Sequence, residues 1–152
     1  MKPQKIIFAC YLIAGVLAFQ LQSCGSKGDP TPKETDAQKN EKILTSSVTS
    51  GWSVQSVMVD GVDDTSIYSK LKLSFTEGSF TATNGDPIWP ASGTWKFTDD
   101  SGQTIQRGDG LIIGVDEITS TTLTLSLTWT ETTLGPGRVK STSGKHVFKL
   151  GK

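Results

Sequence analysis

The sequence predicts an all-β protein, a small antiparallel up-and-down barrel of about eight strands that follows a short helix. Apolar and polar side chains alternate strictly in segments 71–76 (LKLSFT) and 123–130 (LTLSLTWT), which gives each segment one apolar face. Turn sequences such as Asp60-Gly61 and Glu77-Gly78 separate such segments. No long helical pattern lies between them, so consecutive strands pair antiparallel. A closed barrel leaves no free edge strand, and a β-sandwich is the alternative architecture.

Composition limits the classes of function that the chain can serve. Its 152 residues are enough for one domain, and 15 basic side chains balance 15 acidic ones, which argues against nucleic-acid binding. Two cysteines and one histidine are too few for a Cys/His zinc site or a disulfide framework. The sequence contains no G-x-S-x-G, H-E-x-x-H or phosphate-loop motif. We therefore expect a protein that is not an enzyme and that uses no metal and no cofactor.

The first residues have the pattern of a secretory signal. Lys2 and Lys5 precede the apolar run 6–19, which is shorter than a membrane-spanning helix. The run leads to Leu21-Gln22-Ser23-Cys24, which resembles the lipobox of bacterial lipoproteins. The resemblance implies that residues 1–23 are removed, that Cys24 is lipidated, and that this cysteine is the protein's attachment to a membrane. A plain cleaved signal with Cys24 as a free thiol is the alternative.

The segment that follows Cys24 is expected to be a tether. Residues 25–34 (GSKGDPTPKE) contain no apolar side chain that could be buried, so residues 24–42 are interpreted as a lipidated flexible linker that includes the start of a short helix. Gly25 stands where an Asp would signal retention in the inner membrane of enteric bacteria, which favours the outer membrane of the cell envelope. Thr35 and Gln38 have the spacing of a capping box and predict a helix over about residues 36–45.

The barrel domain is predicted to occupy residues 43–152. Besides the two clear strands, weaker alternation predicts strands in the segments 52–59, 80–83, 93–98, 103–107, 111–115 and 145–150. Glycine, proline and aspartate cluster between them, as in Asn84-Gly85-Asp86-Pro87. Strands of this length make a barrel wall of only about 20 Å, so the lumen is small.

Three sequence segments resemble a known family. These are Gly51-Trp52 at the head of the first strand, 93–97 (GTWKF), and the terminal 146–150 (HVFKL). Together they are similar to the lipocalin-like lipoproteins of bacterial envelopes, many of which have no known function. The resemblance covers roughly residues 43–152 and implies the same barrel.

Trp52, Trp95 and Trp129 are in phase with the apolar positions of their strands and should point into the barrel. There they either fill the core or form an aromatic wall for an apolar ligand or a sugar ring. Trp89 lies in the proline-rich segment 86–90 (DPIWP), which predicts a position in a loop or at the rim. A tryptophan there either covers the barrel mouth or contacts a partner.

Two polar side chains fall at apolar positions. His146 alternates with Phe148 and is expected either to be a hydrogen-bonded structural residue or to contact a ligand. Arg107 is in phase with Ile105, and its charge must meet a carboxylate, a carbonyl, an aromatic face or a ligand anion. Arg138, in the long loop 131–144, is either a solvated charge or a contact for a partner.

Two hypotheses for the function remain open at this stage. In the first, the barrel binds a small apolar or amphipathic ligand, with Trp52, Trp95 and Trp129 in its wall. In the second, the barrel core is filled and the protein acts through its surface as an interaction module of the envelope, using loops 84–91 and 131–144.

Overall fold

The computed structural model describes residues 32–46, 50–131 and 143–152. These residues belong to one compact unit, Pro32–Lys152. Its helices are α1 (Asp36–Thr45) and α2 (Thr65–Tyr68). Its strands are β1 (Trp52–Val59), β2 (Val62–Asp63), β3 (Lys72–Thr76), β4 (Ser79–Thr83), β5 (Ser92–Phe97), β6 (Thr104–Arg107), β7 (Ile112–Ile118), β8 (Thr122–Trp129) and β9 (Gly144–Gly151).

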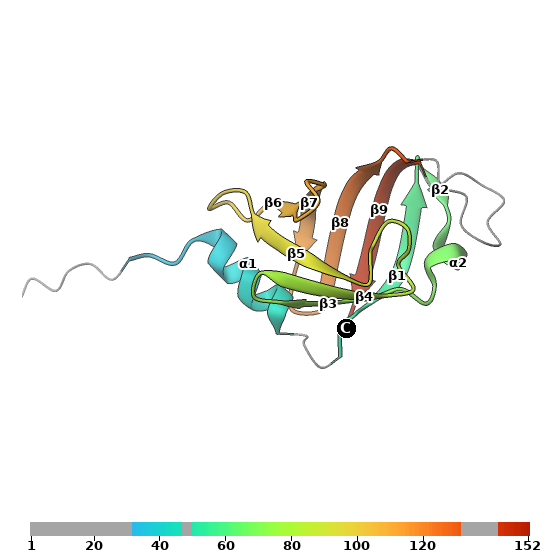
Figure 1. Cartoon of the computed structure of the whole chain (residues 1–152). Helices are drawn as coiled ribbons and strands as arrows, with labels where there is room; N and C mark the ends of the chain where they lie inside the picture. The colour runs from blue at the N-terminus through green and yellow to red at the C-terminus, as the bar shows by residue number, and fades with distance from the viewer. Residues whose placement is uncertain (1–31, 47–49, 132–142) are drawn as a thin grey trace, which may run out of the picture. The chain divides into compact units, whose positions relative to one another are not determined.

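All strands except β2 form a closed antiparallel barrel (Figure 1). From β3 to β9 each strand pairs with the next one in the sequence, β1 pairs with β3 on one side, and β1 pairs with β9 on the other. The last pairing closes the sheet, with Val57 opposite Phe148. The predicted barrel of eight strands is therefore confirmed, and the sandwich alternative is wrong because one continuous sheet closes on itself. Strand β2 is an addition that pairs with the end of β1.

The alternation of the sequence becomes the inside and the outside of this barrel. In β8, Leu123, Leu125 and Leu127 are buried, while Thr124 and Ser126 between them are only partly buried. Two β-bulges interrupt the alternation, between Val54 and Ser56 in β1 and between Val115 and Glu117 in β7. A bulge adds one residue to a strand and shifts the phase of the side chains that follow. This is why the alternation in the sequence predicted an end at residue 115, whereas β7 continues to Ile118.

One end of the barrel, here called the helix end, is covered by α1. The Thr35 hydroxyl accepts a hydrogen bond from the Gln38 amide at 3.2 Å, and the Gln38 side chain accepts one from the Thr35 amide at 2.9 Å, which confirms the predicted capping box. Leu44 is fully buried in the barrel core. The amide of Ala37 donates to the carbonyl of Asp100 at 3.0 Å. Helix α1 is thus part of the packed unit, which begins on the N-terminal side of residue 43.

The opposite end, here called the loop end, is closed by α2 and by the loop 84–91. Tyr68 of α2 and Trp89 of the loop are almost fully buried against the β9 side chain Phe148. Neither β2 nor α2 was predicted, because the segment 62–68 (VDDTSIY) has neither alternation nor a helical period. Among the described residues, neither helix has the length and apolar character needed to cross a lipid bilayer.

Candidate functional site

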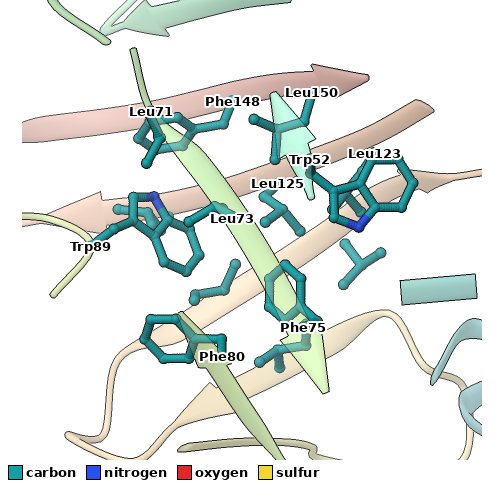
Figure 2. Packing of buried hydrophobic residues seen from close by; sticks show 14 of the residues in the cluster. Trp52, Leu71, Leu73, Phe75, Phe80, Trp89, Leu123, Leu125, Phe148 and Leu150 are labelled. Atoms are coloured by element: carbon teal, nitrogen blue, oxygen red, sulfur yellow. The ribbon is translucent and has the colours of Figure 1, made fainter. Parts of the chain in front are cut away.

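The lumen is the natural place to search for a site, and large aromatic side chains occupy it. Figure 2 shows rings and leucines from different strands meeting inside the barrel. Trp89 packs edge to face on Phe80, with ring centroids 5.7 Å apart, and on Phe148 at 6.0 Å. Phe80 comes from β4 and Phe148 from β9, two strands that are not neighbours in the barrel. The three rings therefore bridge the lumen from β4 to β9 and fill the space between these strands.

Trp52 lies at the helix end, where the structure places it in the core. Its side chain is fully buried, and its indole N–H donates to the carbonyl of Leu44 at 3.3 Å. The ammonium group of Lys152 lies 4.2 Å from the centroid of the same ring. Burial lowers the pKa of the Lys152 ammonium. Trp52 thus links the helix, the C-terminus and the barrel.

Trp95 also lies in the core at the helix end. Its indole N–H is shared between the carbonyls of Thr76 and Ser79, at 3.0 and 2.9 Å, in the turn between β3 and β4. Phe75 and Phe97 pack edge to face against the ring, with centroids 5.8 and 5.3 Å away. The polar atom of Trp95 is therefore fully used by the protein's own backbone.

Arg107 extends from β6 into the loop end, where only 3% of its side chain is exposed. It donates three hydrogen bonds to the Asp109 carboxylate at 2.5 to 3.1 Å, and one to the carbonyl of Ile88 at 2.6 Å. The guanidinium carbon lies 5.6 Å from the centroid of the Trp89 ring. A carboxylate, a carbonyl and an aromatic face thus compensate the buried charge, so Arg107 needs no ligand anion.

The ion pair with Arg107 changes the pKa of Asp109. The hydrogen bond from Arg107 lowers the pKa of the Asp109 carboxyl below the ordinary value of 3.8, against the opposing effect of burial. The Asp109 side chain is 52% exposed, so solvent screens this pair more than the burial of Arg107 alone suggests. Asp109 also accepts the amide of Leu111 at 3.2 Å and so shapes the turn that follows β6.

Trp89 is held beneath this ion pair. It lies in the loop between β4 and β5, as predicted, but only 1% of its surface is exposed. A side chain buried to this degree exposes almost no surface. It fills space at the loop end of the barrel, against Phe80 and Phe148.

His146 is fully buried at the loop end, within hydrogen-bonding distance of two groups. Its Nδ1 lies 3.0 Å from the carbonyl of Gly144, and its Nε2 lies 3.2 Å from the hydroxyl of Tyr68. A carbonyl only accepts, so Nδ1 carries a proton, and in the neutral ring Nε2 accepts from Tyr68. The ring also stacks on Phe148, with centroids 5.7 Å apart. This is a polar pair inside an apolar core.

Two indole N–H groups are buried without a hydrogen-bond partner among the described residues, those of Trp89 and Trp129. Trp129 is the last residue of β8, where it pairs with Gly144 of β9, so both indoles belong to the loop end. Buried donors without an acceptor are rare in proteins and carry a free-energy cost. The packing of the core gives no acceptor to these two indole N–H groups.

The surface offers a second candidate, a depression along α1. It is open to solvent and lies between the helix on one side and β5 with the turn residue Glu77 on the other. Trp95 and Phe97 of β5 line it on the sheet side, and Gln38 and Glu41 line it on the helix side.

The structure thus separates the predicted site residues. Trp52 lies at the helix end, whereas Trp89, Trp129 and His146 lie at the loop end. Trp95 and Arg107 are direct partners in the β5–β6 register, but the indole of Trp95 bonds to the turn between β3 and β4, whereas the guanidinium of Arg107 bonds to Asp109 and Ile88. Cys24 and Arg138 lie outside the described residues. Sequence reasoning missed Asp109 and Tyr68 as partners of the buried polar groups. The sequence carried one signal for this ion pair, because Asp109 follows the inward-pointing Arg107 by only two residues.

Comparisons of the chain with protein-family models, with curated proteins and with solved structures find no match. The antiparallel barrel is compatible with the lipocalin-like fold that the sequence resembles. The functional argument therefore depends on the geometry of the chain itself.

Proposed function

We propose that the chain is a lipid-anchored, non-enzymatic protein of the bacterial cell envelope, and that its filled barrel acts through its surface as an interaction module. One observation carries the second part of this proposal. Five aromatic side chains of one packed core cluster are each at most 2% exposed: Trp52, Trp89, Phe75, Phe80 and Phe148. The last four of them are joined by ring contacts inside the barrel. A barrel of this size holds either its own side chains or one small ligand, and here its own rings take the space.

The anchor is proposed from the sequence segment Leu21-Gln22-Ser23-Cys24. Lipidation of Cys24 would attach the mature chain by two or three acyl chains, which together hold a protein firmly on a bilayer. Residues 24–35 span at most about 40 Å when fully extended. The helix end of the barrel would then remain within that distance of the lipid surface.

Fractionation of cells tests the anchor. Wild-type protein is expected in the membrane fraction, and the Cys24→Ala variant in the soluble envelope fraction. A matched Ser23→Ala variant, which keeps a small residue before the cysteine, should remain in the membrane. Membrane attachment of the Cys24→Ala variant would contradict the proposal.

A second candidate function, binding of a small amphipathic ligand at the loop end, is supported by the orphan indole donors of Trp89 and Trp129. A ligand with hydrogen-bond acceptors that reaches these indoles would satisfy donors that the described residues leave without a partner. Nuclear magnetic resonance of the indole N–H signals tests this. A titration with lauric acid or dodecyl maltoside that shifts the Trp89 and Trp129 signals, and leaves those of Trp52 and Trp95 in place, would favour the ligand-binding function.

A further inference from the structure

The depression along α1 has a free stretch of sheet edge as one wall. The amide of Thr98 donates to the carbonyl of Thr104, and the amide of Gly108 donates to the carbonyl of Thr94. In an antiparallel pair such bonds recur at every second residue. The backbone N–H and C=O groups of the even-numbered β5 residues therefore point toward β6, and those of the odd-numbered residues point toward β4. The amide of Trp95 follows this rule and donates to the carbonyl of Gly78 at 3.0 Å.

The next odd-numbered residue of β5 is Phe97, which extends beyond the first residue of β4. Strand β4 begins at Ser79, and its register places Ser79 opposite Thr94. The N–H and C=O of Phe97 therefore point toward the depression that this residue lines. Among the described residues, no β4 residue pairs with Phe97, and no turn or loop supplies a backbone hydrogen bond to it. Unpaired edge groups of this kind accept an extended segment of another chain.

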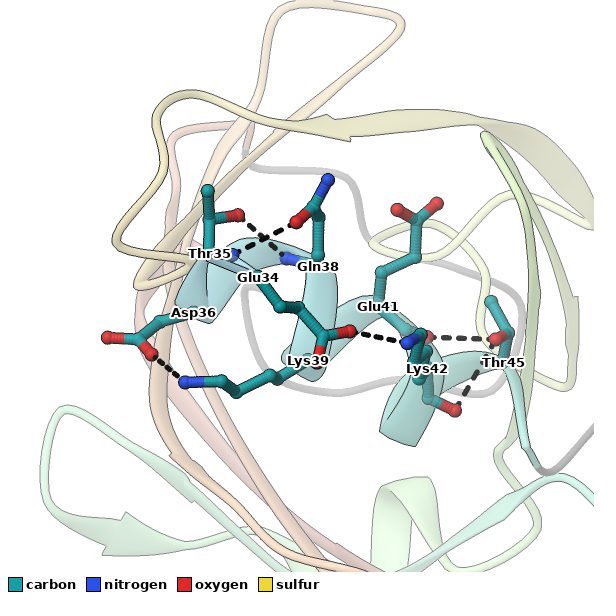
Figure 3. Close-up of polar contacts among 8 residues, drawn as sticks. All are labelled: Glu34, Thr35, Asp36, Gln38, Lys39, Glu41, Lys42 and Thr45. Atoms are coloured by element: carbon teal, nitrogen blue, oxygen red, sulfur yellow. Dashed lines mark hydrogen bonds and ion pairs between the residues drawn. The ribbon is translucent and has the colours of Figure 1, made fainter. Parts of the chain in front are cut away.

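The walls of the depression carry an excess of negative charge. Its lining includes five carboxylates and two ammonium groups, although the chain as a whole is balanced at 15 of each sign. Figure 3 shows that Glu34 is paired with Lys42, whereas no dashed line leaves the carboxylate of Glu41. Within the part of the chain that the structure describes, Glu77 and Asp100 form no ion pair either.

We infer that this groove binds an extended, lysine- or arginine-containing segment of a partner protein, which adds to β5 at Phe97 and places its cationic side chains against Glu41 and Glu77. The inference deepens the proposed function, on which it rests, because it names the surface and the chemistry of the partner. The backbone of Phe97 supplies the pairing, its partly buried side chain supplies an apolar contact, and the carboxylates select the charge.

The test uses a ¹⁵N-labelled chain that begins at Gly25, since the compact unit Pro32–Lys152 has its own core. The probe is a short peptide of alternating lysine and valine. Its addition should shift the amide signal of Phe97 and slow its hydrogen exchange. The same peptide with alternate backbone nitrogens methylated, and a peptide of alternating glutamate and valine, should leave that signal in place. An unmoved Phe97 signal, or equal binding of the methylated peptide, would overturn the inference.

Two variants test the charge requirement. Replacing both Glu41→Gln and Glu77→Gln should weaken binding of the lysine peptide about tenfold at low ionic strength, and salt should reduce the difference. The matched control is Glu117→Gln, an exposed position on β7 that does not line the groove. Equal affinities of all variants would overturn the assigned role of the carboxylates. If the peptide does not bind, the groove inference fails, but the result of the Cys24→Ala fractionation is unaffected. The groove inference and the proposed anchor can therefore be refuted independently.

Discussion

The ammonium group of Lys152, the last residue of the chain, lies 4.2 Å from the centroid of the Trp52 ring, near the start of β1. Its three donors are not all spent on the ring, because it also donates to the carbonyl of Ile43 at 3.3 Å and to the hydroxyl of Ser46 at 2.8 Å. One cation thus joins the C-terminus, the first barrel strand and the end of α1.

This contact predicts that Lys152→Met loosens α1. Methionine keeps most of the apolar stem but loses the cation–π contact and both hydrogen bonds, so we expect a loss of about 1 kcal/mol in the free energy of unfolding. Hydrogen exchange in α1 should accelerate. The control is Lys149→Met, because Lys149 is exposed on β9, the strand that ends one residue before Lys152. Equal exchange rates in the two variants would contradict the role given to Lys152.

A second prediction concerns the buried guanidinium of Arg107. Asp109→Asn leaves this charge with a weaker partner, and we expect a loss of about 2 kcal/mol in stability. Urea denaturation measures the effect. A double-mutant cycle with Arg107→Met should give a clear coupling energy, because the two side chains share three hydrogen bonds. Additive effects of the two substitutions would contradict a specific pair.

The same pair predicts a pH dependence. The pKa of Asp109 in the folded protein is lowered from 3.8, first by the hydrogen bond from Arg107. A depressed folded-state pKa stabilises the fold at pH values above the unfolded value, and this stabilisation is lost as the pH falls through the folded pKa. The stability difference between wild type and Asp109→Asn should therefore shrink as the pH falls below about 4. A difference that stays constant down to the acid transition would refute the assignment.

A fourth prediction concerns the close approach of Gly85 to Trp89. A Cβ atom at this position would lie 2.5 Å from the Trp89 Cβ and 2.6 Å from the Trp89 carbonyl oxygen. Gly85→Ala must therefore displace Trp89, at a cost of about 1 to 3 kcal/mol. Tryptophan fluorescence and urea denaturation report the change. Ser92→Ala, at the exposed first residue of β5, should have little effect on either measurement.

The sequence predicts the fold to a large extent because the barrel is built from local patterns. Alternation in 71–76 and 123–130 locates β3 and β8, and the spacing of Thr35 and Gln38 locates the start of α1. The patterns fail where one residue changes the phase, as at the β7 bulge near Asp116. They also fail for α2, whose only buried side chain, Tyr68, gives no period to detect.

The candidate site is less accessible to prediction because its contacts are not local. The sequence places Arg107 inside the barrel but does not choose among the groups that compensate its charge. One of these, the carbonyl of Ile88, lies 19 residues away in the chain. The free edge at Phe97 depends on where β4 ends relative to β5, which is a property of strand register. Alternation alone fixes the face of a residue and not its neighbour across the sheet.

Native mass spectrometry of the chain that begins at Gly25, purified without detergent, tests the filled barrel most directly. The account predicts the mass of the polypeptide alone, and no change in tryptophan fluorescence on addition of lipophilic probes. A small molecule retained in the spectrum, together with quenching of the buried tryptophans by such probes, would contradict it.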